Sequence, residues 1–177
     1  MQKTYHFTIT KKDNLRYNFL LSQKRLFGAS LMTLAIIGGI IALIRYAQGS
    51  APVDALLQGV LLGVAASALF FTSNVLSTYM RINKLYKNKT LTDFSVDFTV
   101  DKTGIRSVSE LGDATLLWKN VKFIRETKTA FYVFYDKTRA NVMPKGQLTP
   151  EDAKALRSTL ALYYKKTRAA ETPPEAK

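Results

Sequence analysis

The side chains that most often carry out catalysis or hold metal ions are scarce in this sequence. It contains no cysteine and a single histidine, His6. This excludes thiol nucleophiles, disulfides and zinc ribbons, and it disfavours a Ser-His-Asp triad. Neither common spacing of a glycine-rich phosphate loop occurs. Serines and lysines are plentiful, but abundance alone does not indicate a Ser-Lys dyad. We therefore expect no enzymatic activity, no metal and no cofactor.

The plentiful charged groups are cations. The 177 residues include 26 Lys and Arg against 13 Asp and Glu, which gives a formal net charge of +13. Such an excess favours a negatively charged neighbour, either a membrane surface or nucleic acid. The sequence shows no recognition helix, zinc finger or RNP-type signature. We therefore expect membrane lipid as a partner and no nucleic acid.

Two long uncharged stretches support the prediction of a membrane protein. Residues 26–44 form an apolar run without a charged residue, and as a helix it would span about 28 Å. The hydrocarbon core of a bilayer is about 30 Å thick. Residues 55–80 form the second uncharged stretch. The sequence predicts a transmembrane helical hairpin over residues 26–80, with spans at about 26–44 and 55–78.

Two other interpretations of these stretches carry less weight. A buried helix of a soluble protein normally shows a polar face, and neither stretch has a charged residue to supply one. A signal peptide has an apolar run of about 7–15 residues, which is shorter than residues 26–44. A second apolar stretch also follows after a short connection, residues 45–54, so a hairpin fits better.

The distribution of charge predicts the orientation. Residues 1–25 carry a net charge of +5 and residues 81–177 carry +8, whereas the connection at residues 45–54 is neutral. Cytoplasmic segments are enriched in Lys and Arg. We therefore expect a multi-pass protein of the bacterial cytoplasmic membrane, with both termini in the cytoplasm.

Small residues recur at every fourth position of the second apolar stretch, and they include a GxxxG pattern. Small side chains allow two helices in lipid to approach closely. The stripe predicts either packing within the hairpin, against small residues of the first stretch, or a homo-oligomer. Its members are Ala55, Gly59, Gly63 and Ser67; the matching residues are Ala35, Gly38, Gly39 and Ala42.

A cluster of cations without an acid follows the second stretch. Each cation close to an anionic leaflet is worth about 1 kcal/mol. The cluster predicts orientation of the chain or, more specifically, contact with anionic lipid or a partner. It consists of Arg81, Lys84, Lys87 and Lys89.

From residue 91 the apolar period changes to two. Alternation over residues 94–100 predicts a half-buried strand, followed by a turn at Asp101 in which Gly104 has a positive φ. Residues 3–10 also alternate and could add an edge strand to the same sheet. Further strands are predicted at residues 105–110, 114–118, 130–135 and 141–143, with residues 121–126 either extending the third strand or forming another.

A helix closes this domain. Thr149 is a good N-cap and Pro150 suits the first helical position. The fold class is therefore an α+β membrane protein: a transmembrane α-helical hairpin plus a small antiparallel β-sheet or barrel domain, built like a pleckstrin-homology (PH) domain and closed by a C-terminal helix. The expected segments are residues 1–25 (strand and basic juxtamembrane helix), 26–80 (hairpin), 81–90 (basic linker), 91–168 (cytoplasmic PH-like domain) and 169–177 (disordered tail).

Cations of the sheet domain are the remaining candidates for a binding surface. Lys119 and Arg125 surround a predicted strand and are expected to contact anionic headgroups or an acidic partner, unless they only form a solvated face. Lys145 follows Pro144 at a strand-to-helix junction, where it would hold an anion or cap the end of the sheet. The one tryptophan, Trp118, is expected to have a core or sheet-surface role.

The order of these features resembles the bacterial YcxB-like family. The similarity rests on the two apolar helices, on the run W-x-x-V-x-x-I-x-E at residues 118–126, and on Pro144-Lys145 ahead of the last helix. It covers most of the chain, to about Tyr164. The resemblance implies a membrane protein with a C-terminal PH-like domain and no settled biochemical role, and it supplies no catalytic residues.

The sequence favours a binding function over a catalytic one. We expect a membrane-anchored interaction module, in which the cytoplasmic domain binds a protein partner or anionic lipid headgroups. The alternative is a membrane-integral assembly protein that oligomerises through the small-residue stripe.

Overall fold

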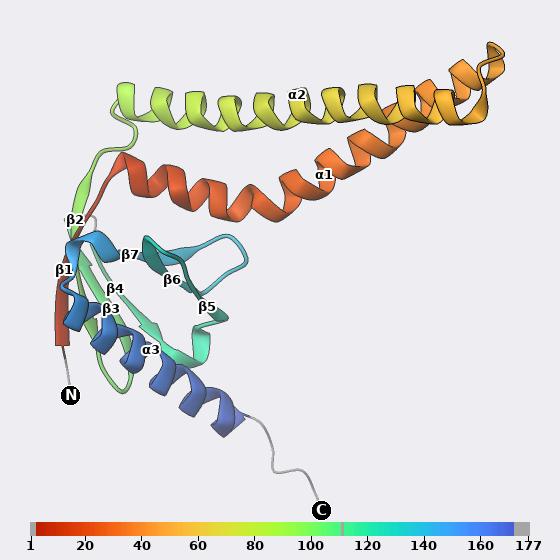
Figure 1. Cartoon of the computed structure of the whole chain (residues 1–177). Helices are drawn as coiled ribbons and strands as arrows, with labels where there is room; N and C mark the ends of the chain where they lie inside the picture. Colours follow the sequence, from red (N-terminus) through yellow and green to blue (C-terminus); the bar gives the residue numbers. More distant parts are fainter. Residues whose placement is uncertain (1–2, 111, 172–177) are drawn as a thin grey trace, which may run out of the picture. The chain divides into compact units, whose positions relative to one another are not determined.

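The computed structural model describes residues 3–110 and 112–171 and confirms the predicted α+β fold class. The chain divides into two units (Figure 1). The helical unit comprises residues 14–91, and the sheet unit combines residues up to 13 with those from 92 onward. The elements are β1 (Lys3–Ile9), α1 (Lys11–Ala47), α2 (Pro52–Lys87), β2 (Phe94–Val100), β3 (Gly104–Ser109), β4 (Gly112–Leu117), β5 (Phe123–Glu126), β6 (Ala130–Phe134), β7 (Ala140–Pro144) and α3 (Pro150–Glu171), with 3-10 turns η1 (Trp118–Asn120) and η2 (Lys145–Gln147).

Helices α1 and α2 are long and apolar enough to cross a membrane. They have 37 and 36 residues, and only 11% and 17% of their most apolar windows are buried. The core helix of a soluble protein would bury far more of such a window. Both helices also run beyond the predicted spans. In particular, α2 continues to Lys87, so most of the basic segment at residues 81–90 is helical.

The small-residue stripe of α2 faces α1. Gly38 and Gly59 approach so closely that a Cβ added to Gly38 would lie 2.9 Å from the carbonyl oxygen of Gly59. A Cβ added to Gly63 would lie 2.8 Å from the carbonyl oxygen of Leu34. Glycine at these positions therefore sets the distance between the two helices.

The ends of the stripe fit the same arrangement. Ala55 is buried, and the Ser67 hydroxyl donates a hydrogen bond of 2.8 Å to the carbonyl oxygen of Ser30 on α1. Gly39 lies off the contact, because a Cβ there would meet no atom within 4 Å. Helix α1 thus packs on the stripe within the chain. The sequence predicted either this packing within the hairpin or a homo-oligomer.

The sheet unit contains two antiparallel sheets, with strand orders β1-β2-β3-β4 and β5-β6-β7. Strand β1 pairs with β2 in a continuous register that sets Tyr5 opposite Phe98 and Phe7 opposite Val96. The N-terminal strand therefore joins the C-terminal sheet. The whole helical unit is an insertion between two neighbouring strands.

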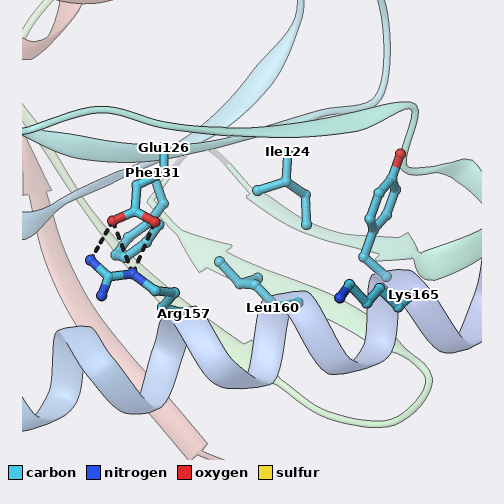
Figure 2. A pocket seen from close by; sticks show the side chains of 8 residues that line it. Ile124, Glu126, Phe131, Arg157, Leu160 and Lys165 are labelled. Atoms are coloured by element: carbon cyan, nitrogen blue, oxygen red, sulfur yellow. Dashed lines mark hydrogen bonds and ion pairs between the residues drawn. The ribbon is translucent and has the colours of Figure 1, made fainter.

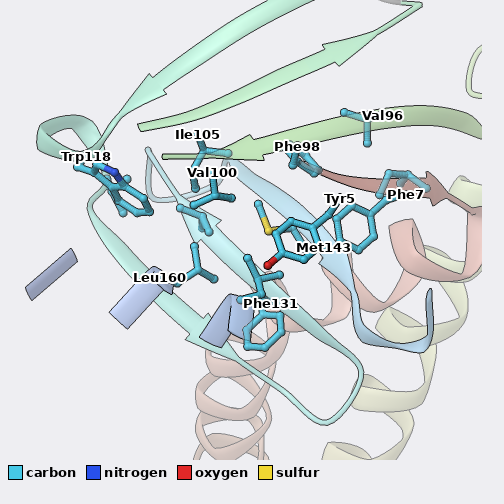
Figure 3. Packing of buried hydrophobic residues seen from close by; sticks show 14 residues of the cluster. Tyr5, Phe7, Val96, Phe98, Val100, Ile105, Trp118, Phe131, Met143 and Leu160 are labelled. Atoms are coloured by element: carbon cyan, nitrogen blue, oxygen red, sulfur yellow. The ribbon is translucent and has the colours of Figure 1, made fainter. Parts of the chain in front are cut away.

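Alternate residues of both sheets point into one apolar cluster (Figure 3). Phe7 and Ile105 from the first sheet are fully buried there with Phe131 from the second. Leu156 and Leu160 cover the cluster from α3. The core thus forms where the two sheets and the last helix meet, and it holds both ends of the chain together.

Trp118 is a core residue. Its side chain is buried, its ring packs against Tyr163 of α3 with centroids 5.6 Å apart, and its indole N–H donates to the carbonyl oxygen of Asp101 at 2.8 Å. A buried indole usually finds such a partner. The tryptophan therefore secures α3 to the β2–β3 turn.

The β2–β3 turn corrects one expectation. The Asp101 carboxylate accepts hydrogen bonds from the backbone N–H groups of Thr103, at 2.7 Å, and Gly104, at 3.0 Å, so the side chain organises the turn. Gly104 does not have a positive φ. Glycine is required there because a Cβ would collide with the carbonyl oxygen of Leu116 on the neighbouring strand.

The start of α3 is as predicted, but its end is not. The Thr149 hydroxyl accepts a hydrogen bond from the N–H of Asp152 at 3.1 Å, which is an N-cap. The helix then runs to Glu171, so residues 169–171, expected in the tail, extend its last turn. Residues 172–177 of that expected tail lie outside the described residues.

Strand β1 forms the outer edge of its sheet, and side chains close that edge. The Gln147 amide accepts a hydrogen bond from the N–H of Thr8 and donates one to the carbonyl oxygen of Thr8, both at 2.7 Å. These are the two hydrogen bonds that a neighbouring strand would make to Thr8. Lys3 forms an ion pair with Asp152 at the start of α3, and this pair lowers the pKa of the Asp152 carboxyl.

The close contact between α1 and α2 predicts the effect of a larger side chain. Gly59→Leu should separate the helices, because a Cβ at this position already collides with Gly38; overpacking of this kind costs about 1–3 kcal/mol. The midpoint of thermal aggregation of the full chain in detergent measures the loss. Gly39→Leu is the matched control and should leave the midpoint unchanged. Equal midpoints for the two variants would contradict the observed packing.

Candidate functional site

The cations at the end of α2 lie in the helical unit. Arg81, Lys84 and Lys87 recur every third residue, so they occupy one side of the last turns, and Lys89 follows the end of the helix with a φ of 54°. All four are exposed. None makes an ion pair with another residue in the described part of the chain. They form a basic strip that remains available to an external anion.

The other predicted cations belong to the sheet unit, where they have different surroundings. Lys119 is exposed in η1. Arg125 is half-buried on β5, directly opposite Tyr132. Because neighbouring side chains of a strand point to opposite faces, Arg125 lies on the face of β5 opposite to Ile124 and Glu126. The strand therefore presents a cation on one face and the candidate groove described below on the other.

Lys145 already has its partners within the chain. Its Nζ forms an ion pair with Glu126 and donates to the carbonyl oxygen of Thr127 at 2.6 Å. It also lies 4.6 Å from the ring centroid of Phe131, and its side chain is only 17% exposed. These contacts tie η2 to the β5–β6 hairpin.

Glu126 links three elements. Both of its carboxylate oxygens accept hydrogen bonds from Nε of Arg157, at 3.0 and 2.9 Å, and Lys145 approaches the same carboxylate. These hydrogen bonds, the one from Arg157 first, hold the pKa of the Glu126 carboxyl below its ordinary value, despite some opposing effect of burial. The network joins β5, η2 and α3.

A groove lies beside this network, between β5 and α3 (Figure 2). It has a volume of about 240 Å³. Its floor is apolar, the Glu126–Arg157 pair closes one end, and Lys165 lies farther along α3. The residues that line it are Ile124, Glu126, Phe131, Arg157, Leu160, Ala161, Tyr164 and Lys165.

The sequence interpretation did not identify this groove. It considered the last helix through its start at Thr149 and Pro150. The signal was a second periodic set, because Arg157, Ala161 and Tyr164 recur at intervals of four and three residues on an adjacent side of α3. The neighbouring strand, however, follows only from tertiary structure. Within the described residues, no group of three or more His, Cys, Asp or Glu side chains could hold a metal ion.

These elements define a class: an α+β chain in which two apolar helices are inserted into a small unit of two antiparallel sheets and a closing helix. A comparison with protein-family models matches residues 100–160 with the family described as YcxB-like protein. The resemblance to that family is therefore confirmed, from the end of β2 to the middle of α3. The match covers about a third of the chain, less than the similarity expected from the sequence. Comparisons with curated proteins and with solved structures gave no match.

The Glu126 network predicts a specific dependence of stability on pH. Because its folded-state pKa is lowered, Glu126 contributes stability above the unfolded-state pKa of about 4.3, and this stability is lost as the pH falls through the folded-state value. Glu126→Gln should therefore lower the melting temperature by a few degrees at pH 7, and the difference from the wild type should shrink below about pH 4.

Scanning fluorimetry of the full chain in detergent from pH 7 to pH 3 measures this difference. Asp113→Asn is the control, because it removes the exposed ion pair between Arg106 and Asp113, and exposed pairs contribute little. A gap between Glu126→Gln and the wild type that stays constant at all pH values would contradict the assignment.

Proposed function

We propose that this protein is a membrane-anchored interaction module. Two transmembrane helices hold a cytoplasmic PH-like domain against the inner leaflet, where the domain binds a protein partner or anionic lipid headgroups. The pairing of β1 with β2 is the observation that carries the proposal. The order of the two small sheets and the closing helix supports the PH-like description.

The pairing constrains the topology. Strand β1 precedes α1 and β2 follows α2, yet the two strands share one ladder. A ladder cannot extend across a bilayer. If α1 and α2 both span the membrane, both outer ends of the helix pair must lie on the same side. The excess of Lys and Arg in the segments outside the hairpin supports the cytoplasmic side of a bacterial inner membrane.

The anchor has a physical purpose in this proposal. Confinement beside the membrane raises the effective concentration of the domain near other membrane components without any new contact. The exposed basic strip of α2 adds about 1 kcal/mol for each cation close to an anionic leaflet. Lys119 and Arg125, which make no ion pair among the described residues, are the contacts we assign to an acidic partner or a headgroup.

The topology predicts where single cysteines can be labelled. The chain has no native cysteine, so each introduced thiol is unique. Ser50→Cys, between α1 and α2, should react with a membrane-impermeant maleimide in intact spheroplasts. Lys137→Cys, in the exposed β6–β7 turn, should react only after lysis. Labelling of Lys137→Cys from outside would contradict the proposed orientation.

The contact assignment predicts the effect of charge reversal. A Lys119→Glu, Arg125→Glu double variant should lose most of the molecules captured by crosslinking in native membranes and identified by mass spectrometry. Lys102→Glu with Lys137→Glu is the charge-matched control, since both residues are exposed in turns, and it should retain them. Unchanged capture by the first variant would contradict the assignment, as would equal losses in both.

A further inference from the structure

Strand β5 has an open edge. It is the outer strand of its sheet and pairs only with β6 among the described strands. The N–H of Thr127 donates to the carbonyl oxygen of Ala130 at 3.0 Å and closes the β5–β6 turn. Because hydrogen-bonded and non-hydrogen-bonded pairs alternate in an antiparallel ladder, the backbone groups of Ile124 and Glu126 point away from β6. An added strand could pair with them.

The outer edges of β1 and β5 differ in how their backbone groups are bonded. The amide of Gln147 satisfies the outer backbone groups of Thr8 on β1. Near β5, side chains of α3 bond to backbone groups just before the strand: the Tyr164 hydroxyl donates to the carbonyl oxygen of Lys122, and the Arg168 guanidinium donates to those of Val121 and Lys122. Proteins usually cover or blunt an exposed edge. Among the described residues, none bonds to the outer backbone groups of Ile124 and Glu126, so this edge of β5 is open where it borders the groove.

The size of the groove selects the kind of ligand. Sites for whole small molecules usually have volumes of about 300–1,000 Å³, whereas this groove has about 240 Å³. Its floor, formed by Ile124, Phe131 and Leu160, is apolar. It therefore suits one apolar side chain projecting from an extended backbone, rather than a complete cofactor.

The charges around the groove select the flanking residues. Two cations, Arg157 and Lys165, line the groove together with a single carboxylate, that of Glu126. Lys165 is exposed and makes no ion pair among the described residues. The excess positive charge complements an acidic ligand.

The spacing along α3 agrees with an extended peptide. Arg157 and Lys165 are separated by eight residues of helix, which corresponds to about 12 Å along the axis. Figure 2 shows Leu160 between them on α3, facing Ile124. In a strand, the residues two before and two after a given position are about 13 Å apart. An apolar residue in the groove would thus have neighbours on the same face within reach of both cations.

We propose that β5 and the groove beside α3 bind an extended acidic segment of a partner protein by strand addition. The segment pairs with the backbone of Ile124 and Glu126, places one apolar side chain in the groove, and directs acidic residues at positions −2 and +2 toward Arg157 and Lys165. This inference rests on the proposed function as an interaction module and names the chemistry of the partner.

The test uses the full chain in nanodiscs and a fluorescein-labelled peptide, Thr-Glu-Thr-Leu-Thr-Glu-Thr, followed by fluorescence anisotropy. Saturable binding is expected. Replacing both Glu by Lys, or methylating the backbone nitrogens that would face β5, should weaken binding at least tenfold. Loss on charge reversal alone, with no effect of methylation, would overturn strand addition.

Variants of the protein locate the site. Ala161→Trp should fill the groove, and Lys165→Glu should repel one acidic residue of the peptide, so each should weaken binding at least tenfold. Leu162→Trp and Lys166→Glu are the matched controls, because both residues are exposed on another side of α3, and they should bind as the wild type does. Equal effects of a groove variant and its matched control would overturn the inference. Displacement of the bound peptide by oleate, but not by an acidic competitor peptide, would overturn it as well.

The two proposals can fail separately. If the peptide does not bind while Lys119→Glu with Arg125→Glu still abolishes capture in membranes, the groove is not the site but the interaction module stands. If the peptide binds in the groove while Lys137→Cys is labelled from outside, the acidic-segment site stands and the cytoplasmic module fails.

Discussion

The ladder between β1 and β2 is the constraint on which the rest of the structure depends. It joins strands that are separated in the sequence by the whole helical unit, and it brings Tyr5, Phe7 and Ile9 into a core otherwise made by residues beyond position 92. Without β1, Val96 and Phe98 would lose their neighbours on one side. The core and the insertion of the helices are therefore parts of one arrangement.

The elements with strong local signals could be predicted from the sequence. Alternation over residues 94–100 identified β2, because every second residue of that strand contributes to the core. Thr149 and Pro150 identified the start of α3, because capping is a local interaction. The two uncharged stretches identified α1 and α2, because the apolar composition of a helix can be recognised without knowing which element packs against it.

Features that depend on residues distant in the sequence could not be predicted. Alternation in β1 indicated a strand that could join the edge of the sheet, but not that β2 is its neighbour. The need for glycine at position 104 arises from the carbonyl oxygen of Leu116 on another strand, not from the turn itself. Lys145 appeared as a free cation because neither Glu126 nor the ring of Phe131 is close in sequence. The groove has the same origin, since it exists only where α3 passes β5.

The β1–β2 pairing also sets an order of events during synthesis. Strand β1 is translated before the two apolar helices, but its partner β2 is made only after them. Strand β1 must therefore wait, unpaired, while α1 and α2 are synthesised. Closing so long a loop in free solution carries an entropic cost. If the helices insert into a membrane as proposed, release of the hairpin into lipid would return both strands to one surface and shorten that search, and insertion and folding would then be coupled.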